Sequence, residues 1–339
     1  MTGRAARGER RKRIGFYMEQ NIPLLLAVAM VITLLVVYIC LYTFEFGFPG
    51  TFEFSSIVNT SMPLAFVAVG QSVVLLTSGI DLSVGGLVSL STCFAALYMG
   101  TSDRNIAWVT AVTLLIGAAA GLVNGLLVAI GRLQPIIVTL ATLSIWSGLA
   151  LYVLPTPGGA VPQALVSTLT GLAWGILPNG VIVALLLLVL LRVFRRTGLA
   201  MSLYAIGNDV SAARANGVSV VRAKVAAYVL CGLCSAAGGV YLAAVTTGGD
   251  PTTGAPFTLT SIAASVLGGV SLLGGRGSAI GAVLGAFMLT LLLNVLFFAH
   301  VSFYLQSFFQ GLVLIVVVAG SAMLARAWRT RRVRASGES

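Results

Sequence analysis

The feature that most constrains this chain is a series of apolar runs of about 20 residues each, which recur from Ile22 to Leu324. A helix needs roughly 20 consecutive apolar residues to cross the hydrocarbon core of a bilayer. Only 9% of the residues are charged, whereas about a quarter are charged in soluble domains. Lipid must therefore surround most of the chain, and little of it remains for a soluble domain.

The apolar runs predict ten membrane-spanning helices in an all-α polytopic membrane protein, with the transmembrane domain at residues 22–325. The expected spans are 22–42, 57–77, 82–99, 108–130, 136–154, 180–194, 225–245, 259–273, 280–298 and 303–324. Residues 155–179 contain prolines and no charge, which predicts an external loop with a short re-entrant or interfacial piece around 164–177. The first run is too long for the apolar region of a signal peptide, so we expect it to be retained.

Basic residues form three blocks, which fall between Arg4 and Arg13, between Arg192 and Lys224, and between Arg326 and Arg334. Lys and Arg resist translocation, so blocks of this kind beside apolar spans stay in the cytoplasm. We therefore expect cytoplasmic basic tails at 1–21 and 326–339, with both termini inside. The blocks flank spans and do not cover one face with interleaved aromatic residues, so the net charge of +11 does not indicate a nucleic-acid partner.

Two glycine-rich segments suggest an internal repeat. Residues 117–125 and 277–285 each contain G-x-x-x-G twice, a spacing that lets helix backbones approach closely. In the expected topology the two segments run in opposite directions through the membrane, as in the inverted repeats of transporters. The alternative is two unrelated packing faces, because the motif is common in membrane helices.

Nothing in the sequence indicates an enzyme. The chain has only two lysines, Lys12 and Lys224, and neither stands in a phosphate-binding loop. The single histidine, His300, falls at an expected outer helix end and joins no catalytic or metal-ligating set. Cys231 and Cys234 match the spacing of a redox or zinc motif, but small residues in an apolar helix are typical of helix packing. We expect no catalytic residue, no cofactor and no bound metal.

Asp81 is the only carboxylate deep within apolar surroundings, in the stretch Thr77-Ser-Gly-Ile-Asp-Leu-Ser-Val-Gly85. A charge at this depth costs a few kcal/mol on insertion scales and needs partners or water. One interpretation places this glycine-bounded break beside the transport pathway or its gate. The other is that Asp81 caps a helix that begins at Leu82. The two roles can coexist, because broken helices are tolerated where they line a cavity.

Uncharged polar residues within the spans can hydrogen-bond the hydroxyl groups of a neutral polar solute. Together with Asp81, the candidate pathway or gate residues are Asn59, Gln71, Ser83, Asn124 and Asn294. The alternative for each of them is a link between helices, worth about 1 kcal/mol.

The longest cytoplasmic connection contains a candidate docking helix, within a loop at 195–222. Asn208 or Asp209 can start a short helix and Gly217 can end it. The residues expected to meet a partner are Asn208, Asp209, Ala212, Ala213, Arg214 and Gly217. A small helix with an alanine face is suited to insertion in a partner's groove, but a merely solvated loop remains the alternative.

Four motifs, in this order, resemble the permeases of ribose-type monosaccharide ABC importers of bacteria. They are Gly79-Ile-Asp-Leu-Ser-Val-Gly85, the stretch 134–142 (Gln-Pro-Ile-Ile-Val-Thr-Leu-Ala-Thr), Ala205-Ile-Gly-Asn-Asp209 with Ala212-Ala-Arg214 and Gly217, and the glycine-rich stretch 262–277. The likeness extends from about Asn59 to Leu324. One departure is that residues 257–261 are neutral, where many relatives carry acidic residues, and this leaves the identity of the solute open.

The resemblance implies a permease subunit in a bacterial inner membrane that imports a monosaccharide or a related small polar solute. It also implies a second permease subunit, identical or paralogous, two cytoplasmic ATP-binding subunits that hydrolyse ATP, and an extracytoplasmic solute-binding protein. The segment from Asn208 to Gly217 would be the coupling helix that docks in the ATPase.

Three alternatives stay open. One is an ABC permease for a non-sugar solute such as a nucleoside. A second is an ion-coupled secondary transporter of a small polar solute, which would need intramembrane ionisable groups beyond a single Asp. The third is a channel, which would need a charged or carbonyl-lined filter that the sequence does not reveal.

Overall fold

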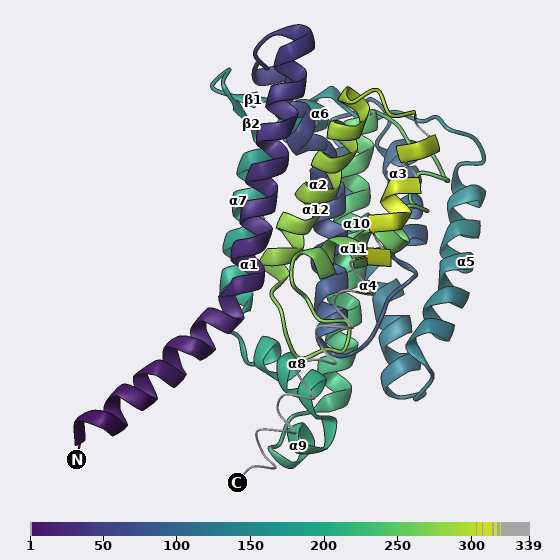
Figure 1. The fold of residues 1–339 in the computed structure, drawn as a ribbon. Helices are drawn as coiled ribbons and strands as arrows, with labels where there is room; N and C mark the ends of the chain where they lie inside the picture. Colours follow the sequence, from purple (N-terminus) through teal and green to yellow (C-terminus); the bar gives the residue numbers. More distant parts are fainter. Residues whose placement is uncertain (1, 303, 307, 314, 317–318, 320–339) are drawn as a thin grey trace.

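The computed structural model describes residues 2–302, 304–306, 308–313, 315–316 and 319. The described chain forms a bundle of helices with one two-stranded hairpin (Figure 1). The prediction of an all-α polytopic fold is therefore confirmed. The predicted last span, at 303–324, lies partly outside the described residues, and the predicted C-terminal tail lies wholly outside them.

The elements follow one another along the chain as follows. They are α1 (Thr2–Phe46), α2 (Thr51–Leu76), α3 (Val84–Met99), α4 (Asn105–Ala129), α5 (Pro135–Val153), α6 (Gln163–Thr170), β1 (Leu172–Ala173), β2 (Leu177–Pro178), α7 (Asn179–Phe194), α8 (Gly198–Asn208), α9 (Val210–Ala215), α10 (Val220–Thr246), α11 (Phe257–Leu267) and α12 (Ala279–Phe298). The strands β1 and β2 pair antiparallel. The helix α6 and this hairpin lie at one end of the bundle, and α8 and α9 lie at the other (Figure 1).

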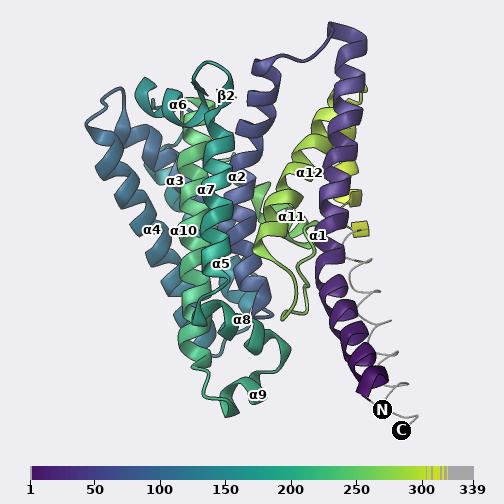
Figure 2. The ribbon, with the colours of Figure 1, turned by 90° about the vertical axis from the view of Figure 1, so that its left-hand side faces the viewer.

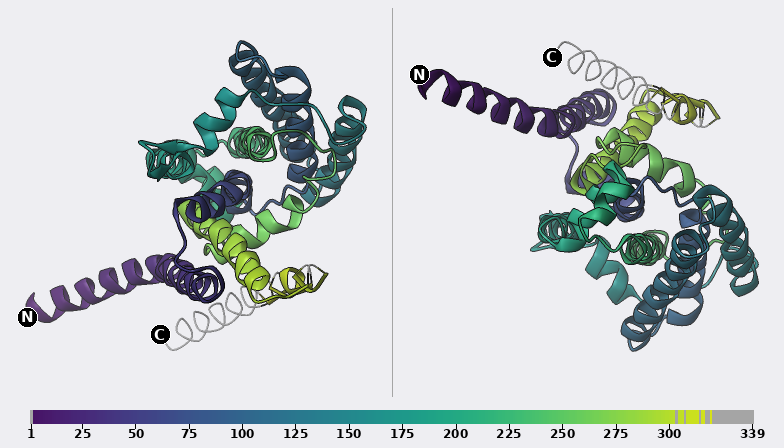
Figure 3. Two further views of the ribbon diagram at one scale, coloured as in Figure 1. Left: turned by 90° about the horizontal axis from the view of Figure 1, so that it is seen from above. Right: turned by 90° about the horizontal axis from the view of Figure 1, so that it is seen from below.

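Six described helices are long and apolar enough to cross a membrane: α1 over Leu24–Phe46, α2, α4, α5, α10 and α12. Three shorter apolar helices, α3, α7 and α11, pack among them. The view along the bundle places α1 on one side and α4 and α5 on the other (Figure 3). The exposed faces of α1 and α5 are rich in large apolar side chains, as expected for surfaces that meet lipid or another subunit.

Two predicted segments differ from the structure. The span expected at 259–273 is helical only to Leu267, and residues 268–278 form a loop with glycines at positive φ, including Gly269 and Gly277. Apolar composition alone does not distinguish a buried loop from a helix, so the second half of that prediction was wrong. The interfacial piece expected at 164–177 is the short helix α6 followed by the hairpin.

The packing of the helices supports an inverted repeat. Helices α2 and α10 pack against each other, α3 and α4 pack on α10, and α11 and α12 pack on α2. Exchanging α2 with α10, α3 with α11 and α4 with α12 therefore reproduces the same set of neighbours. Figure 1 and Figure 2, which are seen at right angles to each other, both show α2 and α10 at the centre of this arrangement.

The glycine motifs are close-packing sites, but they are not equivalent within this repeat. On α4, a Cβ at Gly121 would overlap the Tyr228 carbonyl oxygen of α10. On α12, a Cβ at Gly285 would overlap the Ala264 carbonyl oxygen of α11. The repeat relates α4–α10 to α12–α2, so these glycines serve two unrelated packing faces, which is the alternative that the sequence left open.

Candidate functional site

The centre of the candidate site is a break between α2 and α3. Helix α2 ends at Leu76, Ser78 has a φ of +61°, and α3 begins only at Val84. Gly79 lies in this break, where a Cβ would be 2.9 Å from the Tyr228 hydroxyl oxygen of α10. Any larger residue would crowd that hydroxyl group, so the glycine permits the chain to turn close to α10.

A chain of hydrogen bonds connects the break to α4. The Asp81 carboxylate oxygen Oδ1 accepts from the Ser83 backbone N–H at 2.9 Å and from the Ser83 hydroxyl at 2.6 Å. The Ser83 hydroxyl in turn accepts from the Asn124 side-chain amide at 2.8 Å. All three side chains are 0% exposed. The structure therefore brings together three of the six residues that the sequence proposed for the pathway.

The same cluster holds polar atoms that have no hydrogen-bond partner. They are Asp81 Oδ2, Asn124 Oδ1 and the hydroxyl of Tyr228, which is 1% exposed. Within the described residues the one ion pair joins Glu45 to His300 and does not involve Asp81. Unpaired buried polar groups cost free energy, so the cluster can bind a hydroxyl-bearing molecule or water favourably.

The structure also clarifies the capping interpretation of Asp81. The helix α3 begins at Val84 with Ser83 as its N-cap residue, not at Leu82. Asp81 lies two residues before the cap and stabilises the turn that leads into the helix. This turn uses only one oxygen of the Asp81 carboxylate. The second oxygen, Oδ2, is therefore available for a further hydrogen bond.

The other candidate pathway residues lie apart from this cluster. Asn59 donates to the Thr170 carbonyl at 2.9 Å and accepts from the Tyr241 hydroxyl at 3.0 Å, and so connects α2 to the end of α6 and to α10. Asn294 donates to the Thr290 carbonyl of its own helix. The two contacts of Asn59 match the alternative interpretation, in which polar residues link helices. The contact of Asn294 lies within one helix and links nothing.

Gln71 is different, because its side chain is 0% exposed and neither amide atom has a hydrogen-bond partner. It lies one turn after Ala68, whose carbonyl accepts from the Ser265 hydroxyl of α11 at 3.0 Å. Residues three apart share a helix face, so Gln71 belongs to the face of α2 that packs on α11. It is a second buried polar group with unused hydrogen-bonding capacity, separate from the Asp81 cluster.

Tyr228 is the residue of the cluster that the sequence did not single out. It lies on α10 in the apolar run Ala-Ala-Tyr-Val-Leu. Buried tyrosine hydroxyls usually find a partner, so a tyrosine within an apolar span can mark a polar site. The tyrosine in a predicted span was therefore a weak signal, which became informative only once Gly79 was seen to face it.

Two nearby cysteines have a packing role. Gly70 of α2 lies against the backbone of Cys231 and the Cβ of Cys234, and a Cβ there would be 2.9 Å from each of them. The Cys231 thiol lies beside the Asp81 carboxyl group. Among the described residues no group of three or more His, Cys, Asp or Glu side chains is placed to hold a metal ion.

At the end of the bundle, the predicted short helix is present as α9 (Figure 1). Asp209 is its N-cap residue and accepts from the backbone N–H groups of Ser211 at 2.7 Å and Ala212 at 2.9 Å. Gly217 follows with a φ of +79°. Ala212 is exposed, whereas Ala213 is 4% exposed and packs in the core of this chain. The small size of Ala213 is thus explained by internal packing, and not by a partner's groove.

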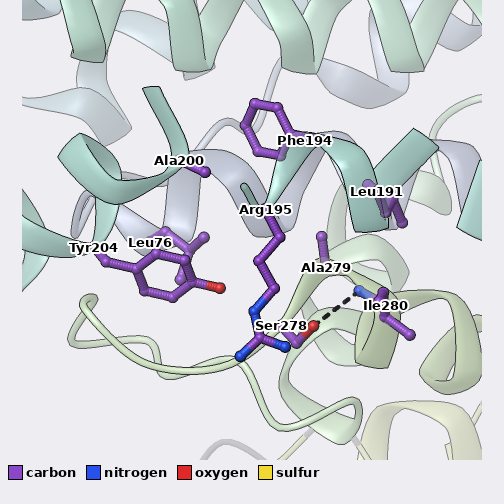
Figure 4. A pocket seen from close by; sticks show the side chains of 9 residues that line it. All are labelled: Leu76, Leu191, Phe194, Arg195, Ala200, Tyr204, Ser278, Ala279 and Ile280. Atoms are coloured by element: carbon purple, nitrogen blue, oxygen red, sulfur yellow. Dashed lines mark hydrogen bonds between the residues drawn. The ribbon is translucent and has the colours of Figure 1, made fainter. Parts of the chain in front are cut away.

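A preceding helix, α8, was not expected from the sequence. Its residue Tyr204 lines a pocket with Leu76, Arg195 and Ser278, between the ends of α7, α2 and α12 (Figure 4). The Tyr204 hydroxyl donates to the Gly277 carbonyl at 2.8 Å. Burial raises the pKa of Tyr204 above its ordinary value, so the hydroxyl keeps the proton that it donates.

These features define a class: a multi-pass helical membrane protein with buried, partly unpaired polar groups at a helix break, which is the construction of a transport protein. The chain belongs to the family described as "Branched-chain amino acid transport system / permease component", whose model matches residues 54–318. Family membership of this kind rests on the sequence and agrees with the fold.

Two relatives illustrate the likeness. The ribose import permease protein RbsC of Escherichia coli (strain K12) is 34% identical over 331 residues, which cover 94% of this chain and 98% of the relative. The autoinducer 2 import system permease protein LsrC of Enterobacter sp. (strain 638) is 37% identical over 283 residues, which cover 82% and 81%. No solved structure matches the chain significantly. The resemblance to ribose-type permeases is confirmed.

Proposed function

We propose that this chain is the permease subunit of an ATP-driven importer and forms the pathway for a monosaccharide or a related small polar solute. The observation that carries the proposal is the buried break at Asp81, where acceptor atoms of Asp81 and Asn124 and the Tyr228 hydroxyl have no partner. Hydroxyl groups of a solute can supply those partners. The apolar interior makes each such hydrogen bond favourable relative to leaving the groups unpaired.

The candidate sites divide between two roles. The Asp81 cluster, with Gln71 as a second buried polar group, would line the pathway or its gate. Asn59, whose amide bonds to the end of α6, would stabilise the helices beside the pathway, and Asn294 would stabilise its own helix. The helix α9, with Asp209 as its cap and Ala212 on its exposed face, would dock in the ATPase.

The partners follow from this assignment. The ends of the bundle would differ in orientation, with α8, α9 and both termini in the cytoplasm, as the basic blocks indicate. The end with α6 would face the solute-binding protein. A second permease subunit, identical or paralogous, would complete the pathway, and ATP hydrolysis would take place on separate cytoplasmic subunits.

The names of the relatives support a sugar as the transported solute but leave other solutes open. Their names state import of ribose and of autoinducer 2, and the family description names branched-chain amino acids. The Asp81 cluster offers acceptors and a hydroxyl, with no cationic partner for a carboxylate among its hydrogen bonds. Acceptors of this kind, together with the Tyr228 hydroxyl as a donor, suit the hydroxyl groups of a sugar. The ammonium group of an amino acid would also suit these acceptors, so leucine is included in the uptake test.

The test is to express the chain with the ATPase and binding-protein genes that neighbour its own, purify the complex and reconstitute it in liposomes. Uptake of radiolabelled ribose, other pentoses and hexoses, a nucleoside and leucine is then measured with internal ATP. We expect co-purification of the ATPase and ATP-dependent uptake of a sugar. Uptake by the chain alone that an ionophore abolishes would establish a secondary transporter in its place.

The docking role of α9 has its own prediction. Ala212→Glu adds a charged side chain to the exposed face and should reduce co-purification of the ATPase by about fivefold or more, since overpacking a close contact costs about 1–3 kcal/mol. The matched control is Ala299→Glu, at an exposed position at the opposite end of the bundle. Equal recovery of the ATPase with both variants would remove α9 from the interface.

A further inference from the structure

The loop 268–278, which joins α11 to α12, lies where three parts of the chain meet. It descends from the bundle to the end of α2 and to α8 (Figure 1). Its Gly274 and Gly275 are buried, although the segment has no regular secondary structure. The site described above does not explain why an irregular loop should be packed so closely.

The loop is hydrogen-bonded to the last turn of α2. The Gly275 backbone N–H donates to the Leu76 carbonyl at 3.0 Å. The Ser78 hydroxyl donates to the Leu273 carbonyl at 2.8 Å. Leu76 and Ser78 lead directly into the break that contains Asp81, so the loop holds the start of that break.

The loop is also hydrogen-bonded to α8. The Tyr204 hydroxyl donates to the Gly277 carbonyl at 2.8 Å, and the Asn208 side-chain amide donates to the Gly275 carbonyl at 3.1 Å. Asn208 immediately precedes Asp209, which caps α9. The contact with the loop and the start of α9 are therefore adjacent in the chain.

Glycines bring the three backbones into direct contact. A Cβ at Gly207 of α8 would overlap both the Leu76 carbonyl oxygen and the Gly275 nitrogen. A Cβ at Gly274 would overlap the Ser78 hydroxyl. Closely packed backbone has little freedom to deform, so a displacement of α8 must move the loop and the end of α2 with it.

The loop is a compact unit fastened to α12. The Ser271 N–H donates to the Arg276 carbonyl at 3.0 Å, and the Gly274 N–H donates to the Ser271 carbonyl at 3.1 Å. A Cβ at Gly281 of α12 would overlap the Gly268 carbonyl oxygen. The junction thus connects the second half of the bundle to the break in the first half.

We propose that the loop 268–278, clamped between Leu76–Ser78 and Tyr204–Asn208, transmits displacement of α8 and α9 to the Asp81 break. This inference rests on the proposed function, in which an ATPase moves α9. Gly207, Tyr204, Asn208 and Ser78 are then positioning residues, which act on the pathway through the loop and do not touch the solute.

The native thiol of Cys231, beside the Asp81 carboxyl group, can report such movement. We would replace Cys40, Cys93 and Cys234 with Ala, purify the complex with its ATPase, and measure the rate of Cys231 labelling by N-ethylmaleimide without nucleotide and with ATP and vanadate. Co-purification of the ATPase is recorded first, since its absence would refute the proposed function itself.

The decisive variant is the double substitution Tyr204→Phe and Ser78→Ala, which removes two hydrogen bonds to the loop and retains the ring. Gly207→Ala crowds the same junction. The matched controls are Gly198→Ala, where no heavy atom lies within 4 Å of the added Cβ, and Ser202→Ala, whose hydroxyl bonds only to the Gly198 carbonyl of its own helix.

We expect nucleotide to change the labelling rate at least about threefold in the parent and in both controls, and the change to vanish in the double variant and in Gly207→Ala. ATPase co-purification should remain at the parent level in all of them. A nucleotide response of parental size in the double variant would overturn the inference, as would the absence of any response in the parent. Faster labelling of the double variant without nucleotide would also overturn it, because the contacts would then serve local stability alone.

Discussion

The two halves of the bundle contain the same turn in different surroundings. In the first half, Asp81 accepts from the backbone N–H and hydroxyl of Ser83, two residues later. In the second half, Asp250 accepts in the same way from the N–H and hydroxyl of Thr252, each at 2.7 Å. Each turn lies between the corresponding helices of the repeat, before α3 and before α11.

The surroundings, and not the local hydrogen bonds, distinguish the two turns. Ser83 also accepts from Asn124, and the whole Asp81 turn is buried. Thr252 is exposed, and the segment beside Asp250 pairs with the loop that precedes α6 through Gly158 and Gly249. Asp250 is half-buried and keeps contact with solvent, whereas the fully buried Asp81 needs partners. The same helix-entry turn thus occurs in both halves, and only the buried one in the first half is assigned to the pathway in the proposed function.

The largest expected effect concerns membrane orientation, because the comparison assumes that the two halves of the bundle are inverted relative to each other. Thr252→Cys and Ser211→Cys should be labelled by a membrane-impermeant thiol reagent from opposite sides, the first from outside intact cells and the second only after lysis. The exposed native Cys40 is replaced with Ala in both. The difference should be all-or-none, since a charged reagent does not cross the bilayer. Labelling of both positions from one side would reject the inverted arrangement.

The next effect concerns transport. Asp81→Asn keeps an oxygen for the Ser83 contacts but replaces the unpartnered Oδ2 with an amide, so membrane abundance should persist while uptake of the transported sugar falls about tenfold or more. A hydrogen bond to a charged group contributes about 1.5–3 kcal/mol, which corresponds to that range. The matched change Asp250→Asn should leave uptake within about twofold. Normal uptake by a well-expressed Asp81→Asn protein would reduce Asp81 to its role in the turn.

The smallest effect is on stability. Ser83→Ala deprives both Asp81 and Asn124 of a partner in a buried place and should cost about 1–3 kcal/mol. Thr252→Ala removes an equivalent contact in an exposed place and should change stability by less than about 0.5 kcal/mol. Thermal unfolding of the detergent-purified proteins measures the difference, and a control such as Gly148→Ala, with no heavy atom near the added Cβ, should behave like the parent. Equal losses of stability in Ser83→Ala and Thr252→Ala would mean that the difference in burial between the two turns has no effect on stability.

Much of the architecture was accessible from the sequence because it depends on the solvent. Lipid requires long apolar helices, so the runs alone predicted a polytopic bundle. The polar residues and the glycine around α9 predicted a short helix that starts at Asn208 or Asp209, and the structure has Asp209 as its cap. Asp81 stood out for the same reason, since a lone carboxylate in an apolar stretch needs an explanation wherever the chain places it.

Only the tertiary structure decided which of the six candidate pathway residues share a site. Asn59, Asn294 and Asn124 look alike as polar residues within apolar spans, yet only Asn124 reaches the Asp81 turn. Likewise, Ala212 and Ala213 are indistinguishable in sequence, and helix rotation exposes one and buries the other. Hydrophobic pattern fixes what lies in lipid, but a hydrogen-bond partner is chosen by the packing of segments far apart in the chain. The loop 268–278 is the clearest case, because its contacts with Leu76 and Asn208 exist only where three backbones converge.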